Sequence, residues 1–267
     1  MACKLGNVID AIEEIVPSDF AEEWDNSGMQ VGDRDRQIKK IWVALDPLPQ
    51  VISAACQEDV DLVITHHPLI FKSLTSIDVS TVEGFVIQQA LDHRLAIFSA
   101  HTNLDRAQNG VNDILASRIG LSNTHCLSND LISGIPGFGK IGELLQATSL
   151  SVLAKNLKQT LGIDHVKVAG NLDMRVKTVA VCSGSGSSMV SAFLDSGADV
   201  FVSGDLRYHD ARTFEFAQKA LIDIGHFASE HLIVETFAQQ LDRHFQSKGL
   251  TLVVEPYTME KDPFVMI

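Results

Sequence analysis

Short apolar runs alternate with amphipathic stretches along most of the chain. Residues 40–46 (KIWVALD), 49–60 (PQVISAACQEDV) and 61–67 (DLVITHH) predict a strand, a helix and a second strand, which together make a βαβ unit. The amphipathic stretch 83–94 and the apolar run 95–101 continue the alternation with a further helix and strand. Alternating strands and helices are typical of a parallel or mixed sheet covered by helices.

The same order returns in the second half of the chain. Residues 177–184 (KTVAVCSG), 187–197 and 198–205 (ADVFVSGD) predict another βαβ unit of similar spacing, which we interpret as a weak internal repeat. The segment 121–140 is rich in glycine, serine and asparagine and predicts a linker or crossover. A long amphipathic helix follows residue 231, with one apolar stripe. That stripe consists of Leu232, Ile233, Phe237, Leu241 and Phe245.

Composition excludes several classes of protein. The chain has 267 residues, of which 45% are hydrophobic, so it can build one large or two ordinary cores without disulfides. Twenty-one basic and 34 acidic residues give a formal charge of −13 and form no basic cluster, which disfavours binding to nucleic acid through a generic basic surface. The four cysteines form no CxxC pair, and no apolar stretch approaches the roughly 20 residues that cross a bilayer. We expect a soluble cytoplasmic protein.

Each of three predicted strands is followed by residues of types that commonly bind metal ions. The stretch LVIT leads to His66 and His67, the stretch LAIFSA leads to His101 and Asp105, and the stretch LIDIG leads to His226 and Glu230. Ligands of open α/β sheets bind at the carboxyl ends of the strands. Pro68 cannot donate to a sheet ladder, so the strand ends near the two adjacent histidines.

Neighbouring side chains of an extended strand point to opposite faces, so the rings of His66 and His67 are expected to diverge and bind different ions. Imidazole and carboxylate donors suit Zn²⁺, Mn²⁺ or Fe²⁺, and a carboxylate can bridge two ions. Two ions about 3.5–4 Å apart would lower the pKa of a bound water and create a hydroxide nucleophile. Hydrolysis is the chemistry that this pattern favours.

Five stretches of the chain carry a resemblance to a known family. They are WDNSGMQVG (24–32), THHPLIF (65–71), SAHTNLD (99–105), SGDLRYHDA (203–211) and IGHFASE (224–230). In these stretches the chain resembles the Nif-three-like family, whose bacterial members are often labelled GTP cyclohydrolase I type 2 homologues. The double histidine, HTNLD and GHFASE are its most specific motifs.

The resemblance implies a Nif-three-like fold, with two αβα-type domains of mostly parallel or mixed sheets, and a toroidal homohexamer with two divalent metal ions per subunit. The boundaries that we expect are 1–124 plus 221–267 for a metal-binding α/β domain and 125–220 for a second α/β domain. The implied metal ligands are His66, His67, Asp105, His226 and Glu230. His101 matches the family's additional histidine, which we interpret as a proton-transfer or outer residue.

Weaker signals surround this pattern. Asp205, Tyr208 and His209 follow a predicted strand and would contact substrate or transfer protons, although an ordinary helix start explains them nearly as well. The turn around Gly184 lacks the third glycine of a dinucleotide-binding motif. We interpret WDNSG (24–28) as structural.

The resulting prediction is a dinuclear metal-dependent hydrolase of the cyclohydrolase or amidohydrolase type, with Zn, Fe or Mn. It would act on a small molecule, either a purine nucleotide ring or a cyclic amide, with His101 or His209 transferring protons. The alternative is a metal-binding regulatory or interaction protein without catalysis. A closed coordination shell would favour the alternative, and an open coordination position would favour the enzyme.

Overall fold

The computed structural model describes residues 3–128 and 134–266 and divides the chain into two compact units. The first unit comprises Met1–Ala107 and Ile233–Lys261, and the second comprises Gln108–Leu232 and Asp262–Ile267. Each unit is built on a mixed sheet with helices on both faces, which confirms the predicted α/β class.

The first unit is a five-stranded sheet between two helical layers. Its elements are β1 (Cys3–Lys4), α1 (Leu5–Glu13), η1 (Ser18–Phe20), β2 (Gly28–Val31), β3 (Gln37–Ile38), β4 (Lys40–Ala44), α2 (Pro49–Gln57), β5 (Leu62–Thr65), α3 (Val82–Asp92), β6 (Ala96–Ser99), α4 (Thr102–Arg106), α10 (Leu232–Ser247) and β13 (Val253–Pro256). The strand order is β13-β4-β5-β6-β2, and only β2 runs antiparallel to its neighbour, whereas β1 and β3 form a separate pair.

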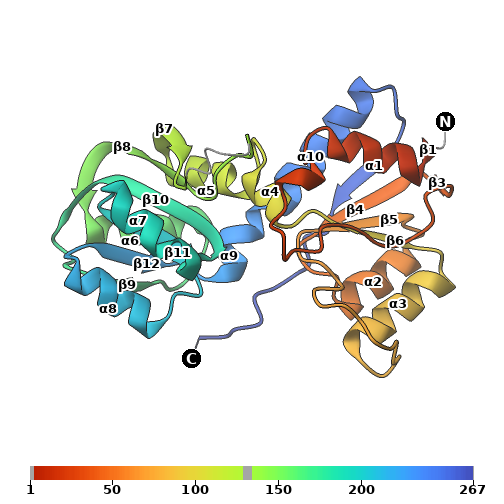
Figure 1. The fold of residues 1–267 in the computed structure, drawn as a ribbon, viewed down its shortest axis with the longest axis horizontal. Coiled ribbons are helices and arrows are strands. Elements are labelled where there is room, and N and C mark those ends of the chain that lie inside the picture. The colour runs from red at the N-terminus through yellow and green to blue at the C-terminus, as the bar shows by residue number, and fades with distance from the viewer. Residues whose placement is uncertain (1–2, 129–133, 267) are drawn as a thin grey trace. The chain divides into compact units, whose positions relative to one another are not determined.

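Helices cover both faces of this sheet, so β5 and β6 are buried along their whole length. In Figure 1, α2 and α3 lie on one face, and α1 and α10 lie on the other. Trp42, Val63 and Ile97 pack against α2 and α3. The carboxyl ends of the parallel strands β4, β5 and β6 lie at one edge of the sheet, which is the edge that positions the site.

The second unit is a six-stranded sheet. Its elements are α5 (Val111–Ile119), β7 (Leu121–Cys126), β8 (Lys140–Ser149), α6 (Leu150–Leu161), β9 (Lys167–Ala169), β10 (Arg175–Ser185), η2 (Gly186–Met189), α7 (Val190–Ser196), β11 (Val200–Gly204), α8 (Tyr208–Phe216), β12 (Ala220–Asp223) and α9 (His226–Glu230). The strand order is β7-β8-β10-β11-β12-β9, in which β10, β11 and β12 are parallel and the remaining pairings are antiparallel.

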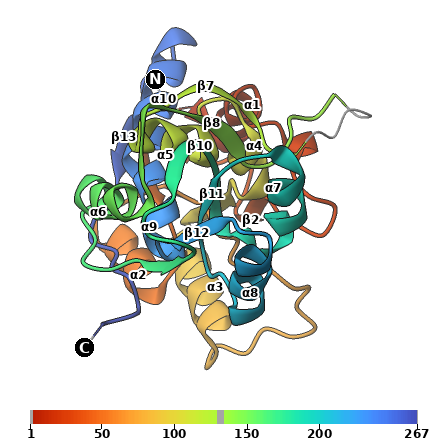
Figure 2. The same cartoon turned by 90° about the vertical axis from the view of Figure 1, so that its left-hand side faces the viewer.

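The two faces of this sheet have separate apolar cores because alternate residues of β10 point to opposite sides. Val179 and Val181 pack with α5 and α6, whereas Ala180 and Cys182 pack with α7 and α8. Figure 2 shows α6 on one side of the sheet and α7 and α8 on the other.

At the start of α8, the buried Asp210 carboxylate accepts hydrogen bonds from the Arg207 backbone N–H (2.9 Å) and from Ser187 Oγ (2.6 Å). These hydrogen bonds tie the helix to the preceding loop and to η2. Burial would raise the pKa of Asp210, but the bonds to the ionised carboxylate outweigh burial and lower that pKa.

The structure departs from the sequence-based expectations in two places. The predicted linker 121–140 contains β7, an edge strand paired with β8, and its residues 129–133 lie outside the described part of the chain. The units meet at 107/108 and 232/233 rather than at 124/125 and 220/221, because β7 and β12 pair within the second sheet.

The four cysteines are free thiols. Across the described ranges, no helix combines the length and the hydropathy needed to cross a bilayer.

Candidate metal-binding site

The histidine pair follows the carboxyl end of β5. The strand ends at Thr65, and the backbone N–H groups of His66 and His67 donate to the carbonyls of Ala44 (3.2 Å) and Leu45 (2.9 Å). The two rings lie 5.0 Å apart with an interplanar angle of 48°. The rings therefore lie next to each other and do not diverge as expected, because the strand has already ended before the first histidine; the binding of different ions by the two residues stays a prediction.

A third histidine, His101, joins this pair. It follows β6 and immediately precedes α4. One potential ligand atom from each of His66, His67 and His101 lies within 4.8 Å of the other two. This spacing is compatible with a metal ion bound among the three rings.

The rings of His66 and His67 are held by their Nδ1 atoms. His66 Nδ1 lies 2.9 Å from the carbonyl oxygen of Ala100, and His67 Nδ1 lies 2.8 Å from Asp46 Oδ1. A carbonyl or carboxylate oxygen only accepts, so Nδ1 carries the hydrogen in both rings, and Nε2 is the nitrogen that would coordinate a metal. Metal-binding histidines usually have such a partner on the other nitrogen, which fixes the tautomer and orients the ring.

Asp25 holds His101 in the same way. Its carboxylate, with a side chain that is 0% exposed, lies 2.7 Å from His101 Nδ1 and accepts hydrogen bonds from Ser27 Oγ (2.8 Å) and the Thr102 backbone N–H (3.1 Å). Burial would raise the pKa of Asp25, but hydrogen bonds from His101, Thr102 and Ser27 hold it far below its usual range. The segment 24–28, interpreted from sequence as structural, therefore supplies the carboxylate that orients His101.

Asp105 lies in α4, close to the histidines. Its side chain is buried, and its Oδ1 atom is 3.9 Å from Nε2 of the buried His66. The helix is fixed on both sides, since Asn103 Oδ1 accepts from Ser27 Oγ (3.0 Å) and Arg106 pairs with Glu22 (2.5 Å). Asp105 thus offers a carboxylate oxygen on the same side of the sheet as the imidazoles.

Glu260, in the C-terminal segment, fixes the backbone at Asp46. The buried Glu260 carboxylate accepts hydrogen bonds from the backbone N–H groups of Leu45 (2.7 Å) and Asp46 (2.8 Å). Burial raises the pKa of Glu260. Asp46 follows a predicted strand, so the strand-end rule that identified the histidines could also have found it, whereas Glu260 had no comparable sequence signal.

In the second unit, His226 and Glu230 form a pair at α9, which follows β12. His226 Nδ1 lies 2.8 Å from Asp205 Oδ2, and its Nε2 atom lies 2.9 Å from Oε2 of the buried Glu230. His226 is therefore held by a carboxylate on Nδ1, as are His67 and His101. Asp205 orients this ring, which gives it a definite structural role.

Because Gly184 has no side chain, it leaves space for His226 and Glu230. Its φ is +62°, and a Cβ atom added there would lie 2.1 Å from Glu230 Oε1 and 3.3 Å from His226 Nε2. Its backbone N–H donates to Ser229 Oγ (2.8 Å) in the same helix. The sequence did not identify Gly184 as a site residue, because its turn resembled only an incomplete dinucleotide motif.

Tyr208 and His209 are exposed in the first turn of α8, with ring centroids 5.4 Å apart. The Tyr208 hydroxyl accepts from Arg212 Nε (2.9 Å). The catalytic role of His209 stays a prediction. The structure groups His66, His67, His101 and Asp105 in the first unit and His226, Glu230 and Asp205 in the second, and a dinuclear centre shared by both groups also stays a prediction.

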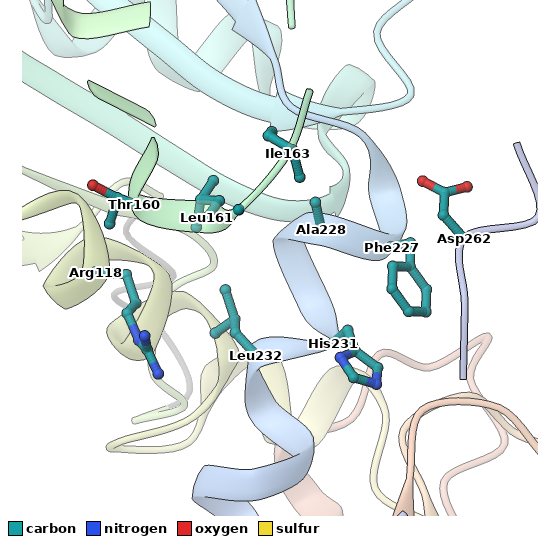
Figure 3. A pocket seen from close by; sticks show the side chains of 10 residues that line it. Arg118, Thr160, Leu161, Ile163, Phe227, Ala228, His231, Leu232 and Asp262 are labelled. Atoms are coloured by element: carbon teal, nitrogen blue, oxygen red, sulfur yellow. The ribbon is translucent and has the colours of Figure 1, made fainter. Parts of the chain in front are cut away.

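A pocket of about 410 Å³ lies beside α9 in the second unit (Figure 3). Phe227 stacks on His231 at 4.6 Å, and Leu161 and Ile163 at the end of α6 add apolar surface. The exposed Arg118 side chain also lines the pocket. The lining of this pocket combines apolar side chains with the polar side chains of Arg118, Thr160, His231 and Asp262.

Comparisons with known proteins place this geometry in context. Residues 3–263 match the family model described as Duf34/NIF3 (NGG1p interacting factor 3). A Clostridium perfringens protein named GTP cyclohydrolase 1 type 2 homolog is 31% identical over 99% of this chain and 100% of its own, and a Streptomyces coelicolor protein of the same name is 33% identical over 98% and 93%. A crystal structure of a Bacillus cereus protein related to NIF3 superimposes with a TM-score of 0.94 at 25% identity, covering 100% of this chain and 99% of that one.

Proposed function

Because this chain belongs to the Duf34/NIF3 (NGG1p interacting factor 3) family, we propose that it is a metal-dependent hydrolase that uses two divalent ions per subunit. The first unit contributes three of the proposed ligands and the second unit contributes two. These ligands are His66, His67, Asp105, His226 and Glu230.

This proposal depends on one observation, which is that three of the histidines are held through the same ring nitrogen. His66, His67 and His226 each use Nδ1 to donate to a carbonyl or carboxylate oxygen, at 2.8–2.9 Å. Holding a histidine through Nδ1 fixes the orientation of its ring and directs Nε2 toward a metal ligand position, and His226 Nε2 lies 2.9 Å from Glu230 Oε2, so this pair offers a nitrogen and a carboxylate donor together. Nitrogen donors combined with buried carboxylates suit zinc, iron or manganese better than magnesium or calcium.

Ions bound by these residues would supply Lewis acidity and generate a nucleophile from water near neutral pH. The proton chemistry is assigned to His101. Its Nε2 atom accepts a proton from the attacking water as the oxygen bonds to an electrophilic carbon of the substrate. The ionised Asp25 stabilises the resulting imidazolium, and the proton then passes to the nitrogen that leaves as the C–N bond breaks. His209 is a second proposed proton carrier.

The proposed substrate is a small molecule with a hydrolysable C–N bond, either in a purine nucleotide ring or in a cyclic amide. The names of the Clostridium perfringens and Streptomyces coelicolor relatives support a nucleotide ring, and GTP ring opening is therefore the first assay.

Metal content and turnover test the proposal together. Protein purified without oxygen should contain near two transition-metal ions per chain, and turnover should disappear on chelation and return on reloading. Glu230→Gln removes a carboxylate charge with little change of shape, so it should abolish turnover in a folded protein. Glu215→Gln changes an exposed glutamate of the same unit and serves as the matched control. A protein that cannot be loaded with metal would refute the proposed site, and turnover that survives Glu230→Gln would refute the proposed chemistry.

We also propose assembly into a homohexamer, which rests on the family resemblance. Strongly exposed apolar side chains, such as Leu145 (86%) and Phe216 (94%), are compatible with burial between copies. Light scattering should give six times the chain mass of 29.1 kDa, and a stable monomer at micromolar concentration would contradict the proposal.

A further inference from the structure

Two large aromatic side chains stand exposed beside the histidines of the first unit. Trp24 is 60% exposed and Phe71 is 51% exposed, and their ring centroids lie 5.9 Å apart at an angle of 61°. Exposing this much aromatic surface loses part of the free energy that burial would provide. The pair comes from two segments that are far apart in sequence, so packing along one helix or strand does not explain it.

Side-chain amides fix the two segments against each other. Asn26 Nδ2 donates to the carbonyl of Ile70 (2.6 Å), the backbone N–H of Ile70 donates to Gln30 Oε1 (3.1 Å), and Gln30 Nε2 donates to the carbonyl of Asn26 (2.7 Å). These bonds form a closed loop immediately beside Trp24 and Phe71. The backbone beneath the two rings is therefore held in place, which lowers the entropy cost of binding a ligand on them.

Both rings also contact His101. Their centroids lie 6.2 Å (Trp24) and 6.4 Å (Phe71) from the imidazole, at interplanar angles of 77° and 76°. A flat group resting on either aromatic ring would thus lie next to the residue to which we assign proton transfer. We propose that Trp24 and Phe71 form a binding site for the planar heteroaromatic ring of the substrate. This inference rests on the proposed function for the position of the reacting group, but ring binding itself requires only the aromatic pair.

Charge favours a neutral ring contact over an ionic anchor. The chain carries a formal charge of −13, and the nearest groups that hold the histidines include the carboxylates of Asp25 and Asp46. Stacking needs no positive side chain and tolerates any aromatic heterocycle, because every base has a π face. The main competing occupant is a second copy of the chain, since Leu74 (41%), Ile77 (61%) and Val79 (53%) are also exposed in the following loop. Those side chains are aliphatic, however, whereas the rings of Trp24 and Phe71 both lie edge-to-face with His101.

Tryptophan fluorescence and calorimetry test the proposal on the full chain. Trp24 and Trp42 are the two tryptophans, and Trp42 is only 9% exposed, with its indole N–H bound to Glu255 (3.0 Å). Guanosine monophosphate, adenosine monophosphate and pterin should quench the Trp24 signal, whereas ribose 5-phosphate, which lacks a ring, should not. Each probe is measured with and without loaded metal.

Substitutions distinguish the loss of ring stacking on Trp24 and Phe71 from a general disturbance of the fold. Trp24→Ala should weaken binding of the best ring probe roughly 5- to 150-fold, and Phe71→Ala should weaken it by a smaller factor. Trp24→Phe keeps an aromatic face, so its calorimetric affinity should stay within a few-fold while the quenching disappears. Phe264→Ala, which changes an exposed aromatic residue of the second unit, should leave the affinity unchanged.

Metal content, measured for each variant, distinguishes the two proposals. A protein that loads metal but binds no ring compound, or binds it equally well after Trp24→Ala, overturns the ring site and leaves the metal site standing. A protein that binds the ring through Trp24 but never loads metal supports the ring site and overturns the proposed function. If Trp24→Ala lowers the mass of the assembly while ring affinity is unchanged, the aromatic pair is an interface between copies and the ring site is refuted.

Discussion

Asp46→Asn offers the sharpest test of the idea that carboxylates prepare the histidines for metal. Asp46 Oδ1 accepts the His67 Nδ1 hydrogen at 2.8 Å, and the Asp46 backbone is held by Glu260 (2.8 Å). Asparagine has nearly the same shape and keeps the backbone contact. The substitution removes the charge that makes Nε2 of His67 a better donor, and it allows the amide to turn its NH₂ group toward the ring.

The expected loss follows from this contact. Replacing the partner that orients a metal-binding histidine typically lowers metal affinity 10- to 100-fold, or about 1.4–2.7 kcal/mol. The Asp46 side chain is 34% exposed, so solvent screening places the expectation toward the lower end. At a fixed excess of free metal, the stabilisation gained on loading should fall by the same free energy.

Competition with a chromogenic chelator measures the affinity, and thermal unfolding with and without metal measures the stabilisation. Asp10→Asn is the control, because Asp10 is 70% exposed in the same unit and pairs only on the surface with Arg34. Equal metal affinity for Asp46→Asn and wild type, in a protein with unchanged metal-free stability, would show that the carboxylate does not prepare His67.

Three further predictions concern the supports of the fold and the site. Gly184→Ala should lower metal occupancy, because the added Cβ would lie 2.1 Å from Glu230 Oε1. Gly197→Ala is the control and should retain metal, because Gly197 has a similar φ of +77° but an added Cβ there would meet no heavy atom within 4 Å. Glu260→Gln should cost about 1–3 kcal/mol in denaturant unfolding, since an NH₂ group would face a backbone N–H, and an unchanged midpoint would contradict this. Asp210→Asn should cost about 1–2 kcal/mol near neutral pH. The pKa of Asp210 is lowered in the folded state, so the stability that its carboxylate contributes is complete above about pH 4 and is lost as pH falls through the folded-state pKa. The difference in unfolding free energy between wild type and Asp210→Asn should therefore shrink in acid. A difference that grows in acid would refute the assignment.

Sequence patterns predicted the parallel core of both sheets because those strands are buried on both faces. Strands β5 and β11 are buried at every residue and read as continuous apolar runs. Edge strands leave no such signal. Strand β7 (LSNTHC) has four exposed positions, and its pairing with β8 is set by tertiary contacts, so the polar composition of 121–140 suggested a linker instead.

The boundary between the units escaped prediction for a related reason. Strand β12 precedes His226, and shared metal chemistry suggested that it belonged with β5 and β6. Its neighbours are β11 and β9, and a pairing partner is a long-range property that a strand's own composition does not specify. Metal-binding residue types at the end of a strand therefore do not specify which sheet that strand joins.

The carboxylates that orient His67 and His101 are the part of the site that the sequence did not predict. Asp46 and His67 are 21 residues apart, and Asp25 and His101 are 76 residues apart, so no local spacing links either pair. Each pair exists because two loops are brought to the same edge of the sheet. Part of the acidic surplus of the chain lies at this edge, since Asp25, Asp46 and Asp105 are all close to imidazole rings in one unit. Carboxylates gathered in this way repel one another unless a cation offsets their charge, so the same acidic surplus that disfavours nucleic acid favours a divalent metal at this edge.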